Sequence, residues 1–348
     1  MKLRSNNNLE VNIFNVGRGL SILIKTPQNL VVIYDLGSTD SFSPINEIYK
    51  YPHFFDDMKT LNGCKISQCI ISHPHLDHIS DLTNDNTSFI AHNTAYITCQ
   101  NDKAENSIGH KIDFSRINNP GENCEQVENY KSLYKKRQLP LVTINPKVDY
   151  VNFQMGYYYL PHKKVNELFS KDDQEYTNSL SIVLYLSFNG NSIVIPGDIN
   201  PDAFELILNG KCEKRFTNYN MNLSNSRRAM WASSTTNEQP ILKDLLKTTN
   251  VAAIVAPHHG LESGYCQKLF EILDDKKPDI ILISEGKHYK NSGSIAKEYQ
   301  DGTTSTGLSE NNKTRWSLTT RNDGHIKIVF DGKTVKYFKF NNYKDMFK

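Results

Sequence analysis

The sequence predicts an α/β fold in which helices and strands form layers. Three short runs near the start are rich in β-branched residues and separated by turn residues, which is typical of strands. These runs are 11–16, 21–26 and 31–37. Apolar residues at loosely helical spacing follow at 45–62, interrupted by Pro52, and an apolar run follows at 66–71. Because a strand, a helix and another strand succeed one another so early, we expect a layered α/β domain.

The later chain alternates between apolar runs and two polar stretches. Further strands are expected at 91–99, 139–144, 155–160, 192–198 and 251–256, and a helix closed by Gly210 is expected at 200–210. The polar stretches are 100–138 and 213–240. The second has the length and polarity of a surface insertion or lid, or of a solvated loop.

The composition restricts the class of protein. Lys and Arg total 40 against 38 Asp and Glu in 348 residues, so the net charge of +2 gives no global attraction to nucleic acid and any basic binding face must be local. Six scattered Cys without a CxxC pair indicate reduced thiols in a cytoplasmic protein. The start has no apolar leader, and no run approaches the ~18 apolar residues of a membrane span, so no membrane association is expected.

The stretch 71–82, ISHPHLDHISDL, places His73, His75, Asp77 and His78 within six positions after an apolar run. Residues i and i+2 of an extended segment point the same way, so His73 and His75 can face one cation. Once the chain bends, Asp77 and His78 can face a second. Imidazole and carboxylate suit Zn²⁺, and Mn²⁺ or Fe where oxygen ligands dominate. Since three of 11 His fall together beside an Asp, we prefer a metal site to a His-rich polar loop.

This stretch resembles the HxHxDH signature of the metallo-β-lactamase fold. Other segments resemble the ComEC-like branch, named for the hydrolase domain attached to bacterial DNA-uptake channels. The matching segments are 11–82, 178–198, 251–286 and 316–332, the last resembling a closing hairpin. The resemblance implies a four-layered αββα sandwich, built as a single hydrolase domain over 1–348 with insertions at about 100–138 and 213–240. The expected lack of a membrane channel departs from the branch's namesake.

The resemblance also implies roles for individual residues. Asp35, just before Gly37, would sit behind the metal site and orient a ligand, although an Asp at a strand end also suits a turn. Asp198, in IPGD, would bridge two cations. In PHHG, His258 is the preferred ligand of the second metal, and His259 could instead donate a proton to a leaving group; either can bind. Asp77 and His259 are thus the catalytic candidates.

The first metal lacks an evident third ligand. The wider fold usually supplies a His some twenty residues before the bridging Asp, and this chain has none there. His92, His110 and His162 are alternatives elsewhere, and Asn178 in TNSLSIVL is expected to take the empty pocket position. Substrate contacts are assigned to Asn178 and to two basic residues of the second polar stretch, Arg227 and Arg228, which together with aromatic residues could bind phosphates and bases.

Hydrolysis is the reaction that these residues support. Two divalent ions, Zn or Mn, would lower the pKa of a shared water and give a hydroxide nucleophile. Phosphodiesters gain most from such a pair, so the first hypothesis is a phosphodiesterase or nuclease acting on DNA, RNA or a nucleotide. One alternative is a small-molecule ester, thioester or amide hydrolase, which would need an apolar pocket. Another is a non-catalytic metal-stabilised interaction module, favoured if the first site lacks a third protein ligand. The oligomeric state is left open.

Overall fold

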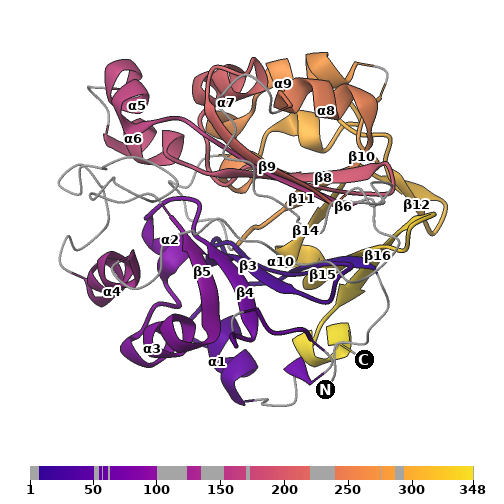
Figure 1. The fold of residues 1–348 in the computed structure, drawn as a ribbon. Helices are drawn as coiled ribbons and strands as arrows, with labels where there is room; N and C mark the ends of the chain where they lie inside the picture. Colours follow the sequence, from indigo (N-terminus) through magenta and orange to yellow (C-terminus); the bar gives the residue numbers. More distant parts are fainter. Residues whose placement is uncertain are drawn as a thin grey trace, which may run out of the picture.

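The computed structural model describes residues 8–50, 55–56, 58–61, 63–99, 124–134, 153–169, 173–219, 240–274, 276–286 and 294–347. Within these ranges, two seven-stranded sheets stack face to face and helices cover both outer faces (Figure 1). The arrangement is the predicted four-layered αββα sandwich, and the α/β fold class is confirmed. The single-domain organisation over 1–348 stays a prediction.

The first sheet has the strand order β16-β15-β1-β2-β3-β4-β5. Its strands are β1 (Leu9–Ile13), β2 (Ser21–Lys25), β3 (Val31–Leu36), β4 (Ile66–Ile70), β5 (Thr94–Thr98), β15 (His325–Phe330) and β16 (Val335–Phe340). The first three strands are antiparallel, whereas β3, β4 and β5 are parallel and are connected through helices. The expected strand, helix, strand order at the start of the chain is therefore confirmed.

The second sheet has the strand order β14-β11-β10-β8-β7-β6-β9. Its strands are β6 (Phe153–Tyr159), β7 (Val183–Phe188), β8 (Asn191–Ile195), β9 (Glu213–Tyr219), β10 (Asn250–Val255), β11 (Ile280–Ile283) and β14 (Ser317–Thr319). A separate small hairpin pairs β12 (Leu308–Glu310) with β13 (Lys313–Arg315). Because β8, β10, β11 and β14 are mutually parallel, their C-terminal ends lie at one edge of the sheet.

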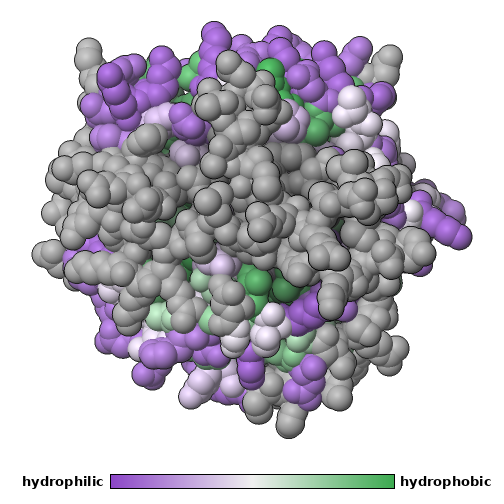
Figure 2. Space-filling view, viewed as in Figure 1, coloured by the Kyte–Doolittle hydropathy of each residue, from purple (hydrophilic) through white to green (hydrophobic). Residues whose placement is uncertain are grey.

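The helices form the outer layers. Those near the first sheet are α1 (Pro44–Lys50), α2 (Leu76–Ile79), α3 (Asn84–Asn93) and α4 (Glu125–Tyr134); α7 (Pro201–Leu208), α8 (Leu242–Thr248) and α9 (Gln267–Leu273) cover the second (Figure 1). The other described helices are α5 (His162–Leu168), α6 (Asp173–Ser179) and α10 (Thr320–Asp323). None of the described helices is long and apolar enough to cross a bilayer. The surface over α7, α8 and α9 is largely hydrophilic (Figure 2).

The apolar core between the sheets comes from alternating strand residues. Buried side chains of both sheets form one cluster that includes Val11, Ile24, Leu184 and Val255. Burial of such residues is the main favourable contribution to folding. Polar contacts join the same faces, since the Tyr34 hydroxyl donates to the Ile182 carbonyl oxygen at 2.7 Å. This core fixes the two sheets, and therefore the loops at their strand ends, relative to each other.

Four predicted elements differ in the structure. Of the helix expected at 45–62, the described residues contain α1 over Pro44–Lys50, and no helix of α type is assigned to the described residues between 55 and 61. The strand expected at 91–99 begins at Thr94, after the last turn of α3. Residues 213–219 of the second expected insertion form β9, which pairs with β6. The strand expected at 139–144 lies outside the described residues.

The fourth difference concerns 316–332, which is not a closing hairpin. β14 pairs in parallel with β11 of the second sheet, whereas β15 pairs with β1 of the first sheet. The short helix α10 lies between them, so the segment crosses from one sheet to the other. The true hairpin partner of β15 is β16. Consequently this segment connects the two sheets, and α10 lies between them (Figure 1).

Candidate metal centre

Loops at the ends of three strands bring the predicted ligands together. His73 and His75 lie on an extended segment after β4, and α2 then turns Asp77 and His78 in another direction. Pro74 stiffens the extended segment because its ring fixes φ. Asp198 follows β8, and His259 belongs to the short helix 257–260 after β10. Residues more than a hundred positions apart in the sequence therefore meet at one edge.

Four side chains form a cluster that can hold a metal ion. One ligand atom from each of Asp77, His78, Asp198 and His259 lies within 4.8 Å of the others. His259 Nε2 is 3.2 Å from Asp77 Oδ2 and 3.3 Å from Asp198 Oδ2. Two imidazole nitrogens and two carboxylates are a suitable set for Zn²⁺ or Mn²⁺.

Two atoms of the cluster lack hydrogen bonds although they are buried. His78 Nε2 and Asp198 Oδ1 lie 3.1 Å apart, and neither makes a hydrogen bond. Buried polar atoms without partners are rare in folded proteins and call for an explanation such as a bound ion. Atoms that converge without bonding each other have the arrangement expected of two ligands of one cation. The residues present therefore fit a divalent metal.

Asp35 holds His78 from behind the cluster. Its Oδ2 lies 2.7 Å from His78 Nδ1 and accepts from the Ser72 hydroxyl at 2.7 Å, while Oδ1 accepts from the Ser72 backbone N–H at 2.6 Å. A carboxylate on one ring nitrogen fixes the tautomer and directs the other nitrogen to the metal. Asp35 thus contacts a predicted ligand, and its role in orienting that ligand stays a prediction. Its φ of 58° is a left-handed conformation that Asp tolerates better than most residues.

His73 and His75 are the residues predicted for the first metal, and their rings lie side by side. His73 Nε2 lies 3.0 Å from His75 Nδ1. His73 Nδ1 lies 3.0 Å from the Ser72 hydroxyl and 3.3 Å from the Ser181 hydroxyl. The hydroxyls occupy one edge of the His73 ring and leave the opposite nitrogen facing His75. These two nitrogens can hold a cation only with help from further ligands.

The candidate third ligands differ in their surroundings. His92 is exposed on α3, with Nδ1 2.6 Å from the Ser88 carbonyl oxygen, and His162 Nδ1 lies 2.7 Å from the Tyr176 hydroxyl. His110 lies outside the described residues. Asn178 is 2% exposed, and its side-chain oxygen is buried without a hydrogen-bond partner. Since Asn178 stands three residues before Ser181, which contacts His73, it remains the candidate for this position.

The side chains of the adjacent residues His258 and His259 have different contacts. Whereas His259 joins the cluster, His258 Nδ1 lies 3.0 Å from the Ser263 hydroxyl and the residue is absent from the four-ligand group. Both adopt positive φ values, 50° for His258 and 57° for His259. Successive left-handed residues are strained and point the rings apart. The structure thus favours His259 as the ligand, in place of the preferred prediction of His258.

Burial disfavours the charged form of each side chain in the cluster, but attraction by neighbouring opposite charges favours that form more strongly. For His78, burial lowers the pKa, but Asp198 and Asp35 raise it well above its ordinary value. For His259, Asp198 overcomes burial and raises the pKa to about 9. Burial also opposes the negative charge of Asp198, yet His259 and His78 hold its pKa well below the usual range. The cluster is therefore strongly coupled and mixes both signs of charge.

The His73 and His75 pair behaves differently. Burial lowers the pKa of both rings, that of His75 to about 4, and mutual repulsion with His78 adds to the effect. Both imidazoles are therefore neutral at pH 7. Neutral imidazole is the form that binds metals.

Sequence reasoning missed the residues that pack behind the ligands. The Ser181 hydroxyl accepts from the Asp198 backbone N–H at 3.1 Å, so it contacts both half-sites. Gly197 has a φ of +62°, and a Cβ there would lie 2.9 Å from Ser72 Cβ. A Cβ at Gly37 would lie 2.7 Å from the Asp77 carbonyl oxygen. The only sequence signal was a glycine within two residues of each predicted Asp, Gly37 after Asp35 and Gly197 before Asp198.

One further described residue bears on the site. Arg18, which no pattern singled out, is exposed in the loop after β1, and its positive charge contributes to lowering the pKa of the buried His258 ring. The predicted substrate residues Arg227 and Arg228 lie outside the described residues. Their contact with substrate stays a prediction.

No protein-family model matches the sequence, and no curated protein matches it. Among solved structures, the chain is similar to the metallo-beta-lactamase fold protein YhfI from Bacillus subtilis, with 11% identity, coverage of 92% of this chain and 99% of that chain, and a TM-score of 0.42. It is also similar to a mutant of the CmlA beta-hydroxylase, with 12% identity, coverage of 80% and 52%, and a TM-score of 0.32.

A third similar structure is a long form of RNase Z from yeast, with 10% identity, coverage of 92% of this chain and 41% of that chain, and a TM-score of 0.35. The chain thus spans about half of the CmlA chain and about two fifths of the RNase Z chain. The ComEC-like branch stays a prediction.

Proposed function

We propose that the protein is a metal-dependent hydrolase that cleaves phosphodiesters in a nucleic acid or nucleotide. The observation that carries the proposal is the convergence of Asp77, His78, Asp198 and His259 around buried atoms that lack hydrogen bonds. Ligands carried by loops at the strand ends suit a catalytic ion better than a structural one, since a catalytic ion keeps a coordination position open for water or substrate. The ions would be Zn or Mn.

In the proposed arrangement Asp77, His78 and His259 would bind one cation, and His73 and His75 would bind the other with Asn178. Asp198 would hold the first cation, since its Oδ1 lies 3.1 Å from His78 Nε2 and its Oδ2 3.3 Å from His259 Nε2. The proposal gives it the second role of bridging to the other cation. When bound, a pair of divalent ions activates water and neutralises the charge that develops on the attacked and leaving oxygens.

The remaining polar residues would position the substrate. His258 is 8% exposed and is held by Ser263, so it is the ring left to donate a proton to a leaving oxygen. Arg18 is exposed, and its charge acts on His258, which supports phosphate binding beside the cluster. We also propose a cytoplasmic location, because the six cysteines are scattered through the sequence without a CxxC pair.

The test uses the purified chain with labelled single- and double-stranded DNA, RNA and bis(4-nitrophenyl) phosphate, with Mn²⁺, Zn²⁺ or Mg²⁺ in turn. The Asp198→Asn variant removes the bridging carboxylate, and His92→Ala is the matched control because His92 is an exposed histidine outside the cluster. We expect metal-dependent cleavage that is lost in Asp198→Asn and kept in His92→Ala.

A different pattern would overturn the proposal. If the chain binds two ions and cleaves esters, thioesters or amides but no phosphodiester, it is a small-molecule hydrolase. If it binds metal and cleaves none of these substrates, the metal stabilises a non-catalytic interaction module. Cleavage that survives in Asp198→Asn would place the chemistry elsewhere.

A further inference from the structure

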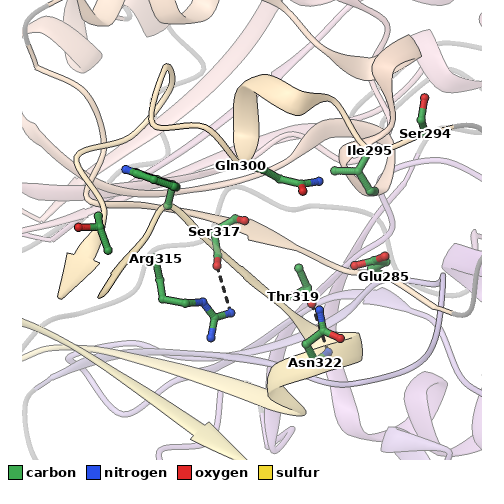
Figure 3. Close-up of a pocket in the computed structure, with 10 residues that line it drawn as sticks. Glu285, Ser294, Ile295, Gln300, Arg315, Ser317, Thr319 and Asn322 are labelled. Carbon is green, nitrogen blue, oxygen red and sulfur yellow. Dashed lines mark hydrogen bonds between the residues drawn. The ribbon is translucent and has the colours of Figure 1, made fainter. Parts of the chain in front are cut away.

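A polar cavity of about 650 Å³ lies along β14, from Trp316 just before the strand to Thr319 and Asn322 at its C-terminal end. Figure 3 shows side chains from separate segments around one central space, with Gln300 on one side, Ser317 and Arg315 on another, and Thr319 and Asn322 below. Trp316 and Glu285 also line it. No residue of this cavity belongs to the proposed metal site.

The cavity is structurally joined to the loop that carries His258 and His259. The Ala296 N–H donates to the Gly260 carbonyl oxygen at 2.9 Å, and the Glu262 N–H donates to the Ser294 carbonyl oxygen at 3.0 Å. Ser294 and the neighbouring Ile295 are wall residues of the cavity. The wall of the cavity and the metal-site loop are therefore one connected unit.

Strand order sets how far apart the two sites lie. β11 is the neighbour of β10, which leads to His259, and β14 is the next strand. Neighbouring strands are about 4.8 Å apart, so the ends of β10 and β14 are separated by about 10 Å, and Trp316 lies three residues before the end of β14, about 10 Å farther along the strand. A single bound molecule of nucleotide size can reach from one to the other.

The charges of the cavity are neutralised by protein partners. Both terminal nitrogens of Arg315 donate to Asp323, at 3.0 and 2.7 Å. Arg321 donates to Glu285 at 3.2 Å. Since these guanidinium groups are already paired, the cavity is a poor site for phosphate. What it offers a ligand is neutral amides and hydroxyls beside an indole.

The indole of Trp316 is held in place by backbone. A Cβ at Gly302 would lie 2.7 Å from Trp316 Nε1, and a Cβ at Gly307 would lie 2.9 Å from Cδ1. Both glycines have a φ of +81°, so side chains are disfavoured there in any case. A fixed aromatic surface beside amide groups is the arrangement by which proteins stack and hydrogen-bond unpaired bases.

We propose that this cavity binds a nucleobase of the substrate, with stacking on Trp316 and hydrogen bonds from Gln300 and Asn322, while the adjoining phosphodiester reaches the metal centre. The proposal rests on the proposed function, because it names the substrate class of the same site. Base binding itself needs no metal.

The test measures nucleoside binding with metal removed by a chelator. Trp231→Phe leaves Trp316 as the only tryptophan, so quenching of its fluorescence reports the cavity. Adenosine, guanosine, cytidine and uridine are titrated, with ribose and inorganic phosphate as comparisons. We expect saturable quenching by the nucleosides and none by ribose or phosphate. The double change Gln300→Ala, Asn322→Ala should weaken the affinity for nucleosides by about 10-fold or more.

Both changed residues are exposed, so folding should be little affected, and Gln267→Ala on α9 is the matched control. Absence of quenching by every nucleoside would overturn the proposal, as would unchanged affinity in the double variant. If ribose bound as tightly as the nucleosides, the cavity would be a sugar site and the proposal of base binding would be refuted.

A baseless substrate separates failure of the cavity from failure of the proposed function. Cleavage of bis(4-nitrophenyl) phosphate depends on the metal centre and not on this cavity. If that ester is cleaved and nucleosides do not bind, only the cavity proposal fails. If nucleosides bind and no phosphodiester is cleaved, the proposed function fails and the base site stands. With both intact, the double variant should raise KM for a dinucleotide and leave kcat for the baseless ester unchanged.

Discussion

Replacing His259 by Ala should remove one of two bound metal ions, whereas replacing His258 should remove neither. His259 Nε2 lies within 3.3 Å of a carboxylate oxygen of both Asp77 and Asp198, while His258 is held by Ser263. Four-ligand zinc sites bind with about 10 to 16 kcal/mol, so one ligand contributes about 3 to 4 kcal/mol. Loss of that amount weakens binding by about 100- to 1000-fold.

The assay is a Zn²⁺ titration against a chromophoric chelator, with the metal content of the dialysed protein measured by mass spectrometry. Wild type, His258→Ala and the exposed control His92→Ala should each retain two ions, and His259→Ala should retain one. The reasoning is refuted if His258→Ala loses an ion while His259→Ala keeps both. Thermal unfolding of each metal-free variant shows whether a loss of metal reflects a loss of fold.

Three further changes test the framework around the site. Asp35→Asn should weaken metal binding by about 10- to 100-fold in the same chelator titration, because His78 loses its orienting carboxylate; unchanged affinity would contradict this. Glu10→Gln should lower the free energy of unfolding in urea by about 3 to 5 kcal/mol, since Glu10 pairs with the fully buried Lys25 at 3.1 Å and with Lys327 at 2.8 Å; a loss below about 1 kcal/mol would refute it. Burial raises the pKa of Asp81 to about 6, so this carboxyl group keeps its proton in the folded chain at pH values where it has lost it in the unfolded chain. The free energy of unfolding of the wild type should therefore fall by up to about 3 kcal/mol as the pH rises from 4 through 6. The Asp81→Asn side chain does not titrate, so in urea unfolding the free energy of unfolding of this variant, relative to wild type, should be higher at pH 7.5 than at pH 4.5. The same difference between variant and wild type at both pH values would contradict the raised pKa of Asp81.

The parts of the site predicted from the sequence are those that local pattern encodes. His73, His75, Asp77 and His78 follow one strand, and Pro74 keeps the first pair extended, so their spacing alone determines two half-sites. Asp198 was found because a strand ended in a Gly-Asp pair. The opening strands of the first sheet followed from the same logic of β-branched runs separated by turns.

The parts that could not be predicted depend on the tertiary structure. Which of His258 and His259 faces the cluster depends on left-handed backbone at both positions, and no local signal reports such a conformation for His. Ser181 binds Asp198 across 17 residues of chain, which no spacing rule covers. The segment 316–332 contains two strand signals close together, and only the pairing of β14 with β11 shows that they belong to different sheets.

Buried charge and backbone strain coincide at this one edge of the fold, and that coincidence argues for function. Asp35 and Asp198 are almost fully buried beside His78, and both His258 and His259 are held at positive φ. Apolar residues of similar volume often stabilise a fold as well as a buried ionic group does, so stability does not require such a cluster. Strained conformations of this kind persist where the surrounding structure fixes them and occur preferentially at active sites. A divalent cation accounts for both features, because it would compensate the carboxylates and bind the atoms that no hydrogen bond reaches.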